Sequence, residues 1–225
     1  MNKIFFIILL FLSFISCRNK KDLTVPVKTE INYFSLKKGD YYLYDVREKQ
    51  YLTFSNTDSI YTLKVSYPET FNDAEGETSY KTYRSRKNEG SKDYQIPSVW
   101  TTKVKNLSYV IVNENNTPFL KLFYPLDENK TWNGNIYNSL SAENFTLMNV
   151  GKPWGNYPVT VTVIQKNDTT LLSRDFRMEV YAKDLGLIYK ETKTVKYSAN
   201  AQDFGKGIIV DGIISKQSLF DHGNE

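Results

Sequence analysis

Short stretches in which apolar and polar residues alternate recur along most of this chain, and they constrain its fold more than any other feature. In SIYTLKVSY, for example, Tyr61, Leu63, Val65 and Tyr67 occupy every second position. Successive side chains of a strand point to opposite faces, so this pattern predicts strands with one buried face and one wet face. No apolar stripe of helical period exceeds about two turns. The sequence therefore predicts a mainly β, antiparallel protein with few short helices, one of them a single turn in SLSAENF (139–145).

Turn residues between the alternating stretches predict where strands are joined. YFSLKKGDYYLYDV (33–46) reads as two strands around a glycine-containing turn. A hairpin is expected across Asn115-Asn116, with Lys121 of its second strand on the wet face. Another turn is expected at Lys166-Asn167-Asp168, since Asn and Asp favour turns.

A sheet with one wet face has to cover its other face. We predict one strongly curved sheet that forms a barrel or half-barrel, and the alternative is a two-sheet β-sandwich. Aromatic-rich sequence runs from Tyr33 to Phe220 without a second linker. Residues 33–225 are therefore interpreted as a single β-rich domain.

The N-terminus carries a targeting segment. Asn2-Lys3 is followed by an apolar run from Ile4 to Ile15, which is shorter than the roughly 20 residues that a membrane-spanning helix needs. A small residue, Ser16, precedes Cys17, the single cysteine of the chain, and a basic polar stretch follows it. This arrangement resembles the bacterial lipoprotein signal, although Phe14 stands where that signal prefers Leu.

The resemblance implies cleavage after residue 16, lipidation of Cys17, and a flexible tether over residues 17–32. Two or more acyl chains would hold the protein on a membrane stably. Arg18 stands where an Asp would suggest inner-membrane retention, so the outer membrane, facing the periplasm, is the expected location. The sequence contains no basic cluster long enough to indicate nucleic acid, so nucleic acid is not expected as a partner.

Four stretches resemble a family of uncharacterised outer-membrane lipoproteins from Bacteroidota. They are YFSLKKGDYYLYDV, KTWNGNIYN, EVYAKDLGLIYKE and KQSLFDHGN, in this order along nearly the whole mature chain. The resemblance implies one intact domain and brings no catalytic residues. The first stretch also resembles half-barrel lipoproteins that shelter acyl chains, which implies a curved sheet and suggests an apolar ligand.

The residue inventory argues against an enzyme. His222 is the single histidine, and no multi-cysteine cluster, nucleophile elbow, P-loop or dinucleotide fingerprint occurs. No cofactor and no metal site are predicted, and the acidic loop with Asp73, Glu75 and Glu77 does not have EF-hand spacing. Two functional alternatives stay open: a carboxylate-dependent glycan hydrolase, which needs two facing acids, and a purely structural envelope component.

Aromatic residues are abundant, with 17 Tyr, 13 Phe and three Trp. Trp132 and Trp154 lie beside Asn and Gly and are candidates for binding a small molecule, a glycan or a protein, although closing the β core is the favoured interpretation. Tyr42 and Tyr44 are candidates on the concave side of the sheet. That side is expected to be apolar and to be lined by Tyr42, Tyr44, Tyr61, Leu63, Leu120 and Leu122.

Two tripeptides resemble the sequon for O-glycosylation of exported Bacteroidota proteins. They are Asp58-Ser59-Ile60 and Asp168-Thr169-Thr170, and both are expected to lie in turns. Ser59 and Thr169 are therefore candidate glycosylation sites.

Overall fold

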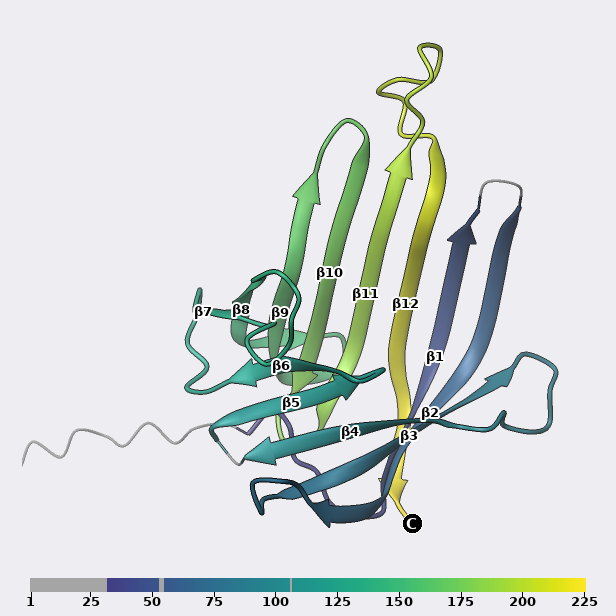
Figure 1. Cartoon of the computed structure of the whole chain (residues 1–225). Helices are drawn as coiled ribbons and strands as arrows, with labels where there is room; N and C mark the ends of the chain where they lie inside the picture. Colours follow the sequence, from purple (N-terminus) through teal and green to yellow (C-terminus); the bar gives the residue numbers. More distant parts are fainter. Residues whose placement is uncertain (1–31, 53–54, 106) are drawn as a thin grey trace, which may run out of the picture.

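Twelve strands form one antiparallel sheet in the computed structural model, which describes residues 32–52, 55–105 and 107–225 (Figure 1). The strands are β1 (Asp40–Tyr51), β2 (Asn56–Asn72), β3 (Thr78–Asn88), β4 (Ser98–Lys105), β5 (Tyr109–Glu114), β6 (Thr117–Phe123), β7 (Thr131–Asn133), β8 (Asn144–Trp154), β9 (Tyr157–Thr169), β10 (Ser173–Ala182), β11 (Gly186–Tyr197) and β12 (Ile209–Asn224). Within these ranges no residue is helical, and so no helix there is long and apolar enough to cross a membrane. The helical turn expected in residues 139–145 is wrong, because bends and irregular chain lead directly into β8.

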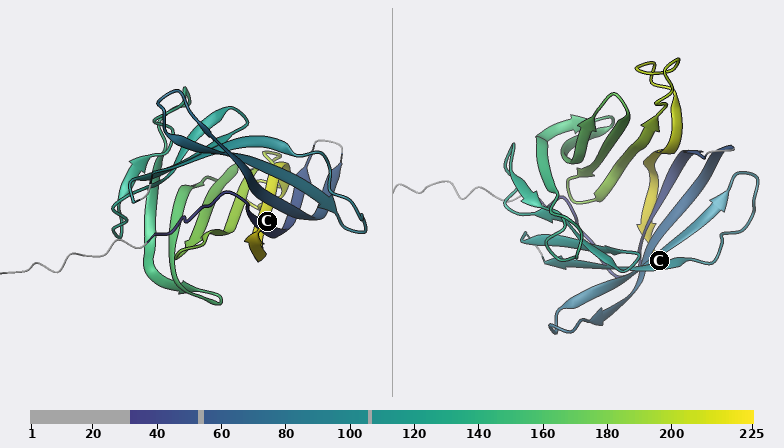
Figure 2. Two further views of the ribbon diagram at one scale, coloured as in Figure 1. Left: turned by 90° about the horizontal axis from the view of Figure 1, so that it is seen from below. Right: turned by 45° about the horizontal axis from the view of Figure 1, so that its top comes forward.

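The order of the strands nearly closes the sheet on itself. It runs β6-β5-β4-β3-β2-β1-β12-β11-β10-β9-β8-β7. The N-terminal strand β1 therefore pairs with the C-terminal strand β12, and the two edges of the sheet are β6 and β7. At this seam the backbone N–H of Leu120 donates to the carbonyl of Gly134 at 2.9 Å. Figure 2 shows the sheet curling around a central space. The curved, barrel-like sheet is thus confirmed, and the sandwich alternative is wrong.

Two turn predictions had opposite outcomes. Asn115 and Asn116 join β5 to β6 with φ values of 49° and 65°, the left-handed pair that suits a tight hairpin. The turn expected at residues 166–168 is wrong, because β9 continues to Thr169. The chain reverses at Thr170 instead, whose N–H donates to the carbonyl of Ser173 at 2.9 Å and whose hydroxyl accepts the N–H of Leu172. Local hydroxyl bonding therefore fixes this turn.

The segment before β1 is not the strand that the sequence suggested. Residues 33–36 run as extended chain across the underside of the barrel, as Figure 2 (left) shows. The N–H of Tyr33 donates to the Tyr124 hydroxyl at 3.0 Å, and the Tyr80 hydroxyl donates to the carbonyl of Leu36 at 3.1 Å. These bonds connect the segment to the chain just after β6 and to β3, so it lies across one end of the barrel and adds no strand to the sheet.

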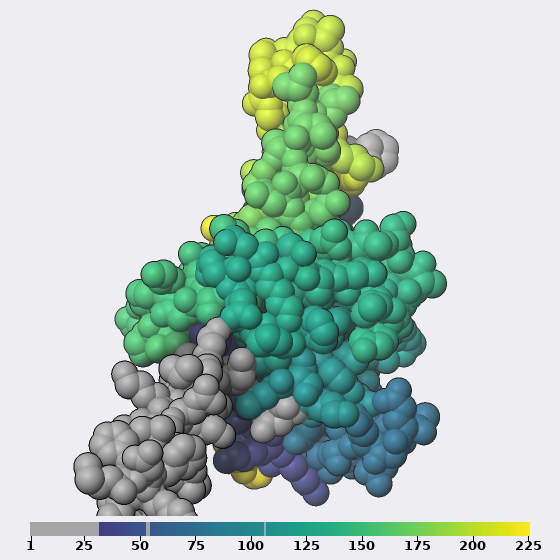
Figure 3. Space-filling view, turned by 90° about the vertical axis from the view of Figure 1, so that its left-hand side faces the viewer, coloured from purple at the N-terminus to yellow at the C-terminus, as the bar shows by residue number. Residues whose placement is uncertain are grey.

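Two groups of buried side chains form the core. One gathers residues of β5, β6, β7, β8 and β9 around Tyr33 and Phe34, and the other gathers residues of β1, β2, β10, β11 and β12. The hairpin ends of β9–β10 and β11–β12 extend beyond this core and stand as a narrow projection in Figure 3. Its tip exposes Leu171 and Phe204.

Candidate functional site

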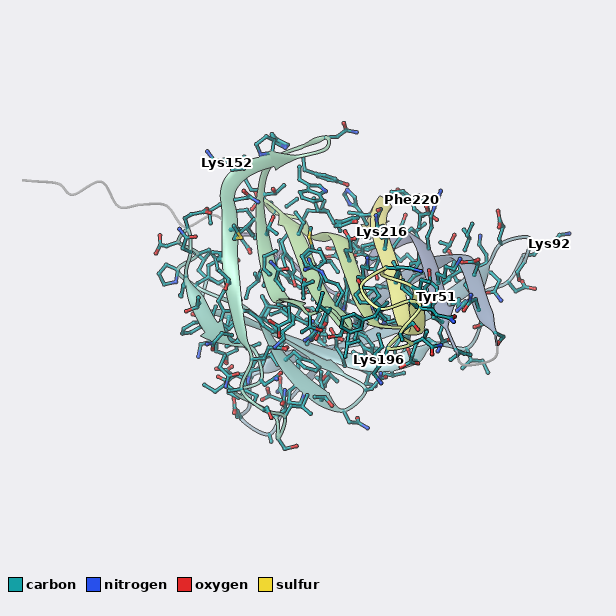
Figure 4. All side chains as sticks on the ribbon, turned by 90° about the horizontal axis from the view of Figure 1, so that it is seen from above. Tyr51, Lys92, Lys152, Lys196, Lys216 and Phe220 are labelled. Atoms are coloured by element: carbon teal, nitrogen blue, oxygen red, sulfur yellow. The ribbon has the colours of Figure 1, made fainter. Side chains whose placement is uncertain are left out.

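A cavity of about 60 Å³ lies inside the barrel, between β1–β6 on one side and β10–β12 on the other. Its aromatic lining comprises Phe34, Tyr42, Tyr44, Tyr67, Trp100 and Tyr181, and its charged lining comprises Arg84, Glu114, Lys121, Glu179 and Lys190. Side chains fill most of the enclosed space when the barrel is viewed from above (Figure 4), which leaves the cavity small. It has room for several water molecules, and it is much smaller than the roughly 300–1,000 Å³ of sites for drug-sized ligands.

Tyr42 and Tyr44, two of the predicted binding residues, are part of the wall of this cavity. Their hydroxyls donate to the carbonyls of Leu185 at 3.1 Å and Leu187 at 3.0 Å. Burial raises the pKa of both phenols, and neighbouring tyrosines raise it further. Both hydroxyls are therefore neutral donors that fix the rings, and the ring faces are what the two residues offer to a ligand.

The expectation that the concave side is apolar is wrong in its centre, where four charged side chains form an ion cluster. The Nζ of Lys121 lies 2.7 Å from Glu114 Oε1 and 3.0 Å from Glu179 Oε1, and the Nζ of Lys190 lies 3.2 Å from the same Glu179 oxygen. The hydroxyl of Tyr181 donates to the other oxygen of Glu179 at 2.6 Å. Buried charges are tolerated when they are paired in this way. We call these four charged residues the inner ion cluster.

The electrostatics of the inner ion cluster keep Glu114, Glu179 and Lys121 charged. Burial raises the pKa of Glu179, but Lys121 and Lys190 lower it by more, so the pKa lies well below its usual range. The same opposing effects lower the pKa of Glu114. Burial lowers the pKa of Lys121, and the carboxylates of Glu114 and Glu179 outweigh that effect and raise it. Both acids are therefore ionised at neutral pH.

The wet-face prediction for Lys121 is wrong, and a β-bulge gives the reason. Val110 of β5 pairs with Leu122, and the next residue, Ile111, pairs with Leu120, so Lys121 is the extra residue of β6. A bulge re-aims the side chains around it. Leu120 and Leu122 are both buried, as expected, and Lys121 is 5% exposed. Alternation read from one strand cannot locate a bulge, because the bulge is a property of the pair.

Sequence reasoning did not single out Glu179, although its neighbours carry a signal. Met178, Val180, Tyr181 and Ala182 are all buried beside it. A run that is apolar at consecutive positions is typical of a strand buried on both faces. An acid inside such a run has to be buried with a partner, and this argument could have pointed to Glu179.

The structure does not bring Trp132 and Trp154 together. Trp132 is 6% exposed, and its indole N–H donates to the Leu120 carbonyl at 2.9 Å. Trp154 packs against Tyr189, with ring centroids 5.3 Å apart, beside the other core group. Neither lines the cavity, whereas Trp100 does. Binding by Trp132 or Trp154 stays a prediction.

The acidic loop between β2 and β3 surrounds a lysine. The Nζ of Lys103 lies 2.8 Å from Asp73, 2.6 Å from Glu75 and 3.2 Å from Glu77. Burial lowers the pKa of Lys103, but hydrogen bonds to the three carboxylates outweigh that effect and raise it. In the part of the chain that the structure describes, no group of three or more His, Cys, Asp or Glu could hold a metal ion.

The candidate modification sites are not in turns. Ser59 lies within β2, opposite Glu48 of β1, and Thr169 is the exposed last residue of β9. The turn expected around each is wrong, because both hairpins extend further than the Asp-Ser and Asp-Thr dipeptides suggest. Glycosylation of Ser59 and Thr169 stays a prediction. Cys17 lies outside the described residues.

Fold and cavity together define a nearly closed, all-β antiparallel barrel with an aromatic and charged interior. No protein-family model matches the sequence, and no curated protein matches it. Among solved structures, the fold is similar to an exported-protein candidate with a YmcC-like fold from Bacteroides fragilis, with a TM-score of 0.45, 8% identity and coverage of 86% of this chain and 100% of that chain. A lipoprotein candidate from Parabacteroides distasonis gives a TM-score of 0.44, also with 8% identity, and coverage of 86% and 99%. At this level of similarity neither neighbour assigns a function to the chain.

Proposed function

We propose that the protein is a non-enzymatic lipoprotein, anchored through Cys17 in the outer membrane on its periplasmic side, that binds a ligand inside its barrel. The signal-like N-terminus supports the anchor and the location. The single observation that carries the binding proposal is the interior cavity, where aromatic rings and fixed charges converge. Concave sites with apolar walls and a few placed polar groups are the usual form of small-ligand sites.

The hydrolase alternative rests on Glu114 and Glu179, which both contact Lys121 Nζ and therefore lie close to each other. A glycosidase needs one carboxyl group that stays protonated as the general acid, and its pKa is raised. Here the pKa of both acids is lowered by the neighbouring lysines. This electrostatic arrangement supports binding over hydrolysis.

The binding proposal is tested on the mature chain, residues 17–225, with Cys17→Ser to remove the anchor. Lipids, glycans, peptidoglycan fragments and peptides are screened by calorimetry, and product formation is followed by mass spectrometry. A ligand of the interior should lose affinity in Trp100→Phe, which alters the cavity wall, and keep it in Trp154→Phe. Turnover that disappears in a folded Glu179→Gln variant would overturn the proposal in favour of the hydrolase.

The anchor is tested separately in cells. Cys17→Ser should abolish incorporation of labelled palmitate and should release soluble protein or leave uncut precursor. If the variant still carries the label and sediments with membranes, Cys17 is not the lipidation site.

A further inference from the structure

Two hydrogen-bond donors in the cavity wall lack an acceptor among the residues that the structure describes. The guanidinium carbon of Arg84 lies 4.0 Å from the centroid of the Trp100 ring, and within the described ranges Arg84 forms no ion pair. Gln217 is 7% exposed, and its Nε2 has no hydrogen-bond partner among the described residues. A buried amide donor without an acceptor costs free energy, so its presence in a cavity wall points to an acceptor inside the cavity, which a ligand atom can supply.

The charges of the cavity wall do not balance. Three cations and two carboxylates line it. Lys121 and Lys190 are both engaged with the two glutamates of the inner ion cluster. Arg84 is therefore the surplus positive charge. The cavity wall carries a net charge of +1, which favours binding of an anion.

Strand register places both donors on the inner side. Gln217 of β12 lies between Val46 of β1 and Lys190 of β11, in the row that continues to the inner ion cluster. Arg84 of β3 is the partner of Val65, another residue of the cavity wall. The positive charge of Arg84 also acts on the phenols of Tyr44 and Tyr67, where it opposes the rise in pKa that burial causes.

This set of groups suits one kind of ligand. A guanidinium binds a carboxylate through two parallel hydrogen bonds, and it does so while stacked on an aromatic ring. The tyrosine and phenylalanine rings offer apolar contact for the remainder of the molecule, and the volume of about 60 Å³ limits that remainder to a few atoms. Building on the proposed interior binding, we propose that the cavity binds a small organic monocarboxylate, with Arg84 pairing its carboxylate and Gln217 donating to it.

Calorimetric titrations of the mature chain with acetate and butyrate test this assignment, with acetamide and butyramide as neutral controls of the same shape. The acids should bind at least about tenfold more tightly than the amides, since the charge-assisted bonds are lost in the amides. Arg84→Gln should weaken acid binding by about tenfold or more and amide binding by much less, so that the preference for acids over amides is lost. Arg86→Gln is the matched control, because Arg86 lies two residues further along β3, stacks on Tyr61 and does not line the cavity.

Several results would overturn the assignment. Equal affinity for acids and amides, phosphate binding as tightly as butyrate, or acid binding that survives Arg84→Gln would each do so. If Arg84→Gln does not fold, Arg84→Lys and Gln217→Leu replace it, and unchanged acid binding in both contradicts the proposal. If a compound from the broader screen binds in a Trp100-dependent manner while no carboxylate binds, interior binding stands and the carboxylate assignment falls. If nothing binds in either experiment, both fall.

Discussion

The inner ion cluster and the loop around Lys103 use the same chemistry in two environments. In the inner ion cluster Lys121 contacts two carboxylates, and in the loop Lys103 contacts three, all at 2.6–3.2 Å. The side chains of Lys121 and Glu179 are 6% and 2% exposed, whereas in the loop Lys103 is 13% exposed and its partners Glu77 and Glu75 are 36% and 75% exposed. Exposed charges are solvated with or without their partners, and buried charges are not. Ion pairs of similar length in the two clusters are therefore expected to contribute very differently to the free energy of unfolding.

The largest effect is expected from Lys121→Met, which keeps a side chain of similar length and removes the charge. Removing one partner of a buried ion pair leaves uncompensated charge behind and costs about 3–5 kcal/mol. Urea unfolding of the variant should show a loss of that size in the free energy of unfolding. A loss as small as that of a surface lysine would show that water reaches the inner ion cluster.

A second substitution sharpens this result. Glu179→Gln removes one negative charge and keeps an acceptor for the Tyr181 hydroxyl. In the double variant Lys121→Met with Glu179→Gln, Glu114 and Lys190 remain as a balanced pair at 3.8 Å. The double variant should therefore be more stable than the sum of the single losses predicts, by about 0.5–3 kcal/mol. Strict additivity would contradict the coupling.

The next effect concerns acid pH. Because the pKa of Glu114 and of Glu179 is lowered in the folded state, the stability they contribute is present above the unfolded value near 4.5 and is lost as the pH falls through the folded values. The free energy of unfolding should fall from about pH 5 downward. In Lys121→Met two acids share one lysine, so the pKa of one acid rises in the folded state. The free energy of unfolding of this variant should therefore increase as the pH falls from 7 to 5. Urea titrations at several pH values would show this reversal of slope, and parallel slopes would contradict it.

The residue-level predictions that were confirmed depend on a single strand or turn, although other local predictions, such as the turn at residues 166–168, were wrong. The hairpin at Asn115-Asn116 and the burial of Leu120 and Leu122 followed from local pattern. The position of Lys121 did not, because the bulge in β6 is set by its register with β5. The meeting of Lys121 and Glu179, which are 58 residues apart, depends on closure of the whole sheet. Of the cavity wall, Tyr42 and Tyr44 had been placed on the concave side from the sequence, and their role in binding stays a prediction; Arg84 and Gln217 could be identified only from the closed sheet.

An alkaline transition should follow from the buried tyrosines. Burial raises the pKa of Tyr67 to about 12, and it raises the pKa of Tyr44 and Tyr181 as well. A phenol whose pKa is raised in the folded state contributes stability that is present below the unfolded value near 10 and is lost above it. Absorbance at about 295 nm should show the exposed phenols ionising first and the buried ones ionising together with unfolding. A single smooth titration near pH 10 with the fold intact would contradict this burial.

The smallest effect is expected from Lys103→Met, the counterpart of Lys121→Met at the surface. Two of its carboxylate partners, Glu75 and Glu77, are 75% and 36% exposed, and Glu77 keeps a second lysine, Lys105, at 2.9 Å. The loop also keeps hydrogen bonds of its own, since Asp73 Oδ1 accepts the N–H groups of Glu75 and Glu77 at 3.0 Å. The loss of stability should be a small fraction of that in Lys121→Met. Salt screens exposed charges and hardly affects buried ones, so 1 M NaCl should remove most of the Lys103 effect and leave the Lys121 effect in place. Urea unfolding of both variants with and without salt measures the difference, and a salt-insensitive loss in Lys103→Met would show that the surface loop behaves as a buried cluster.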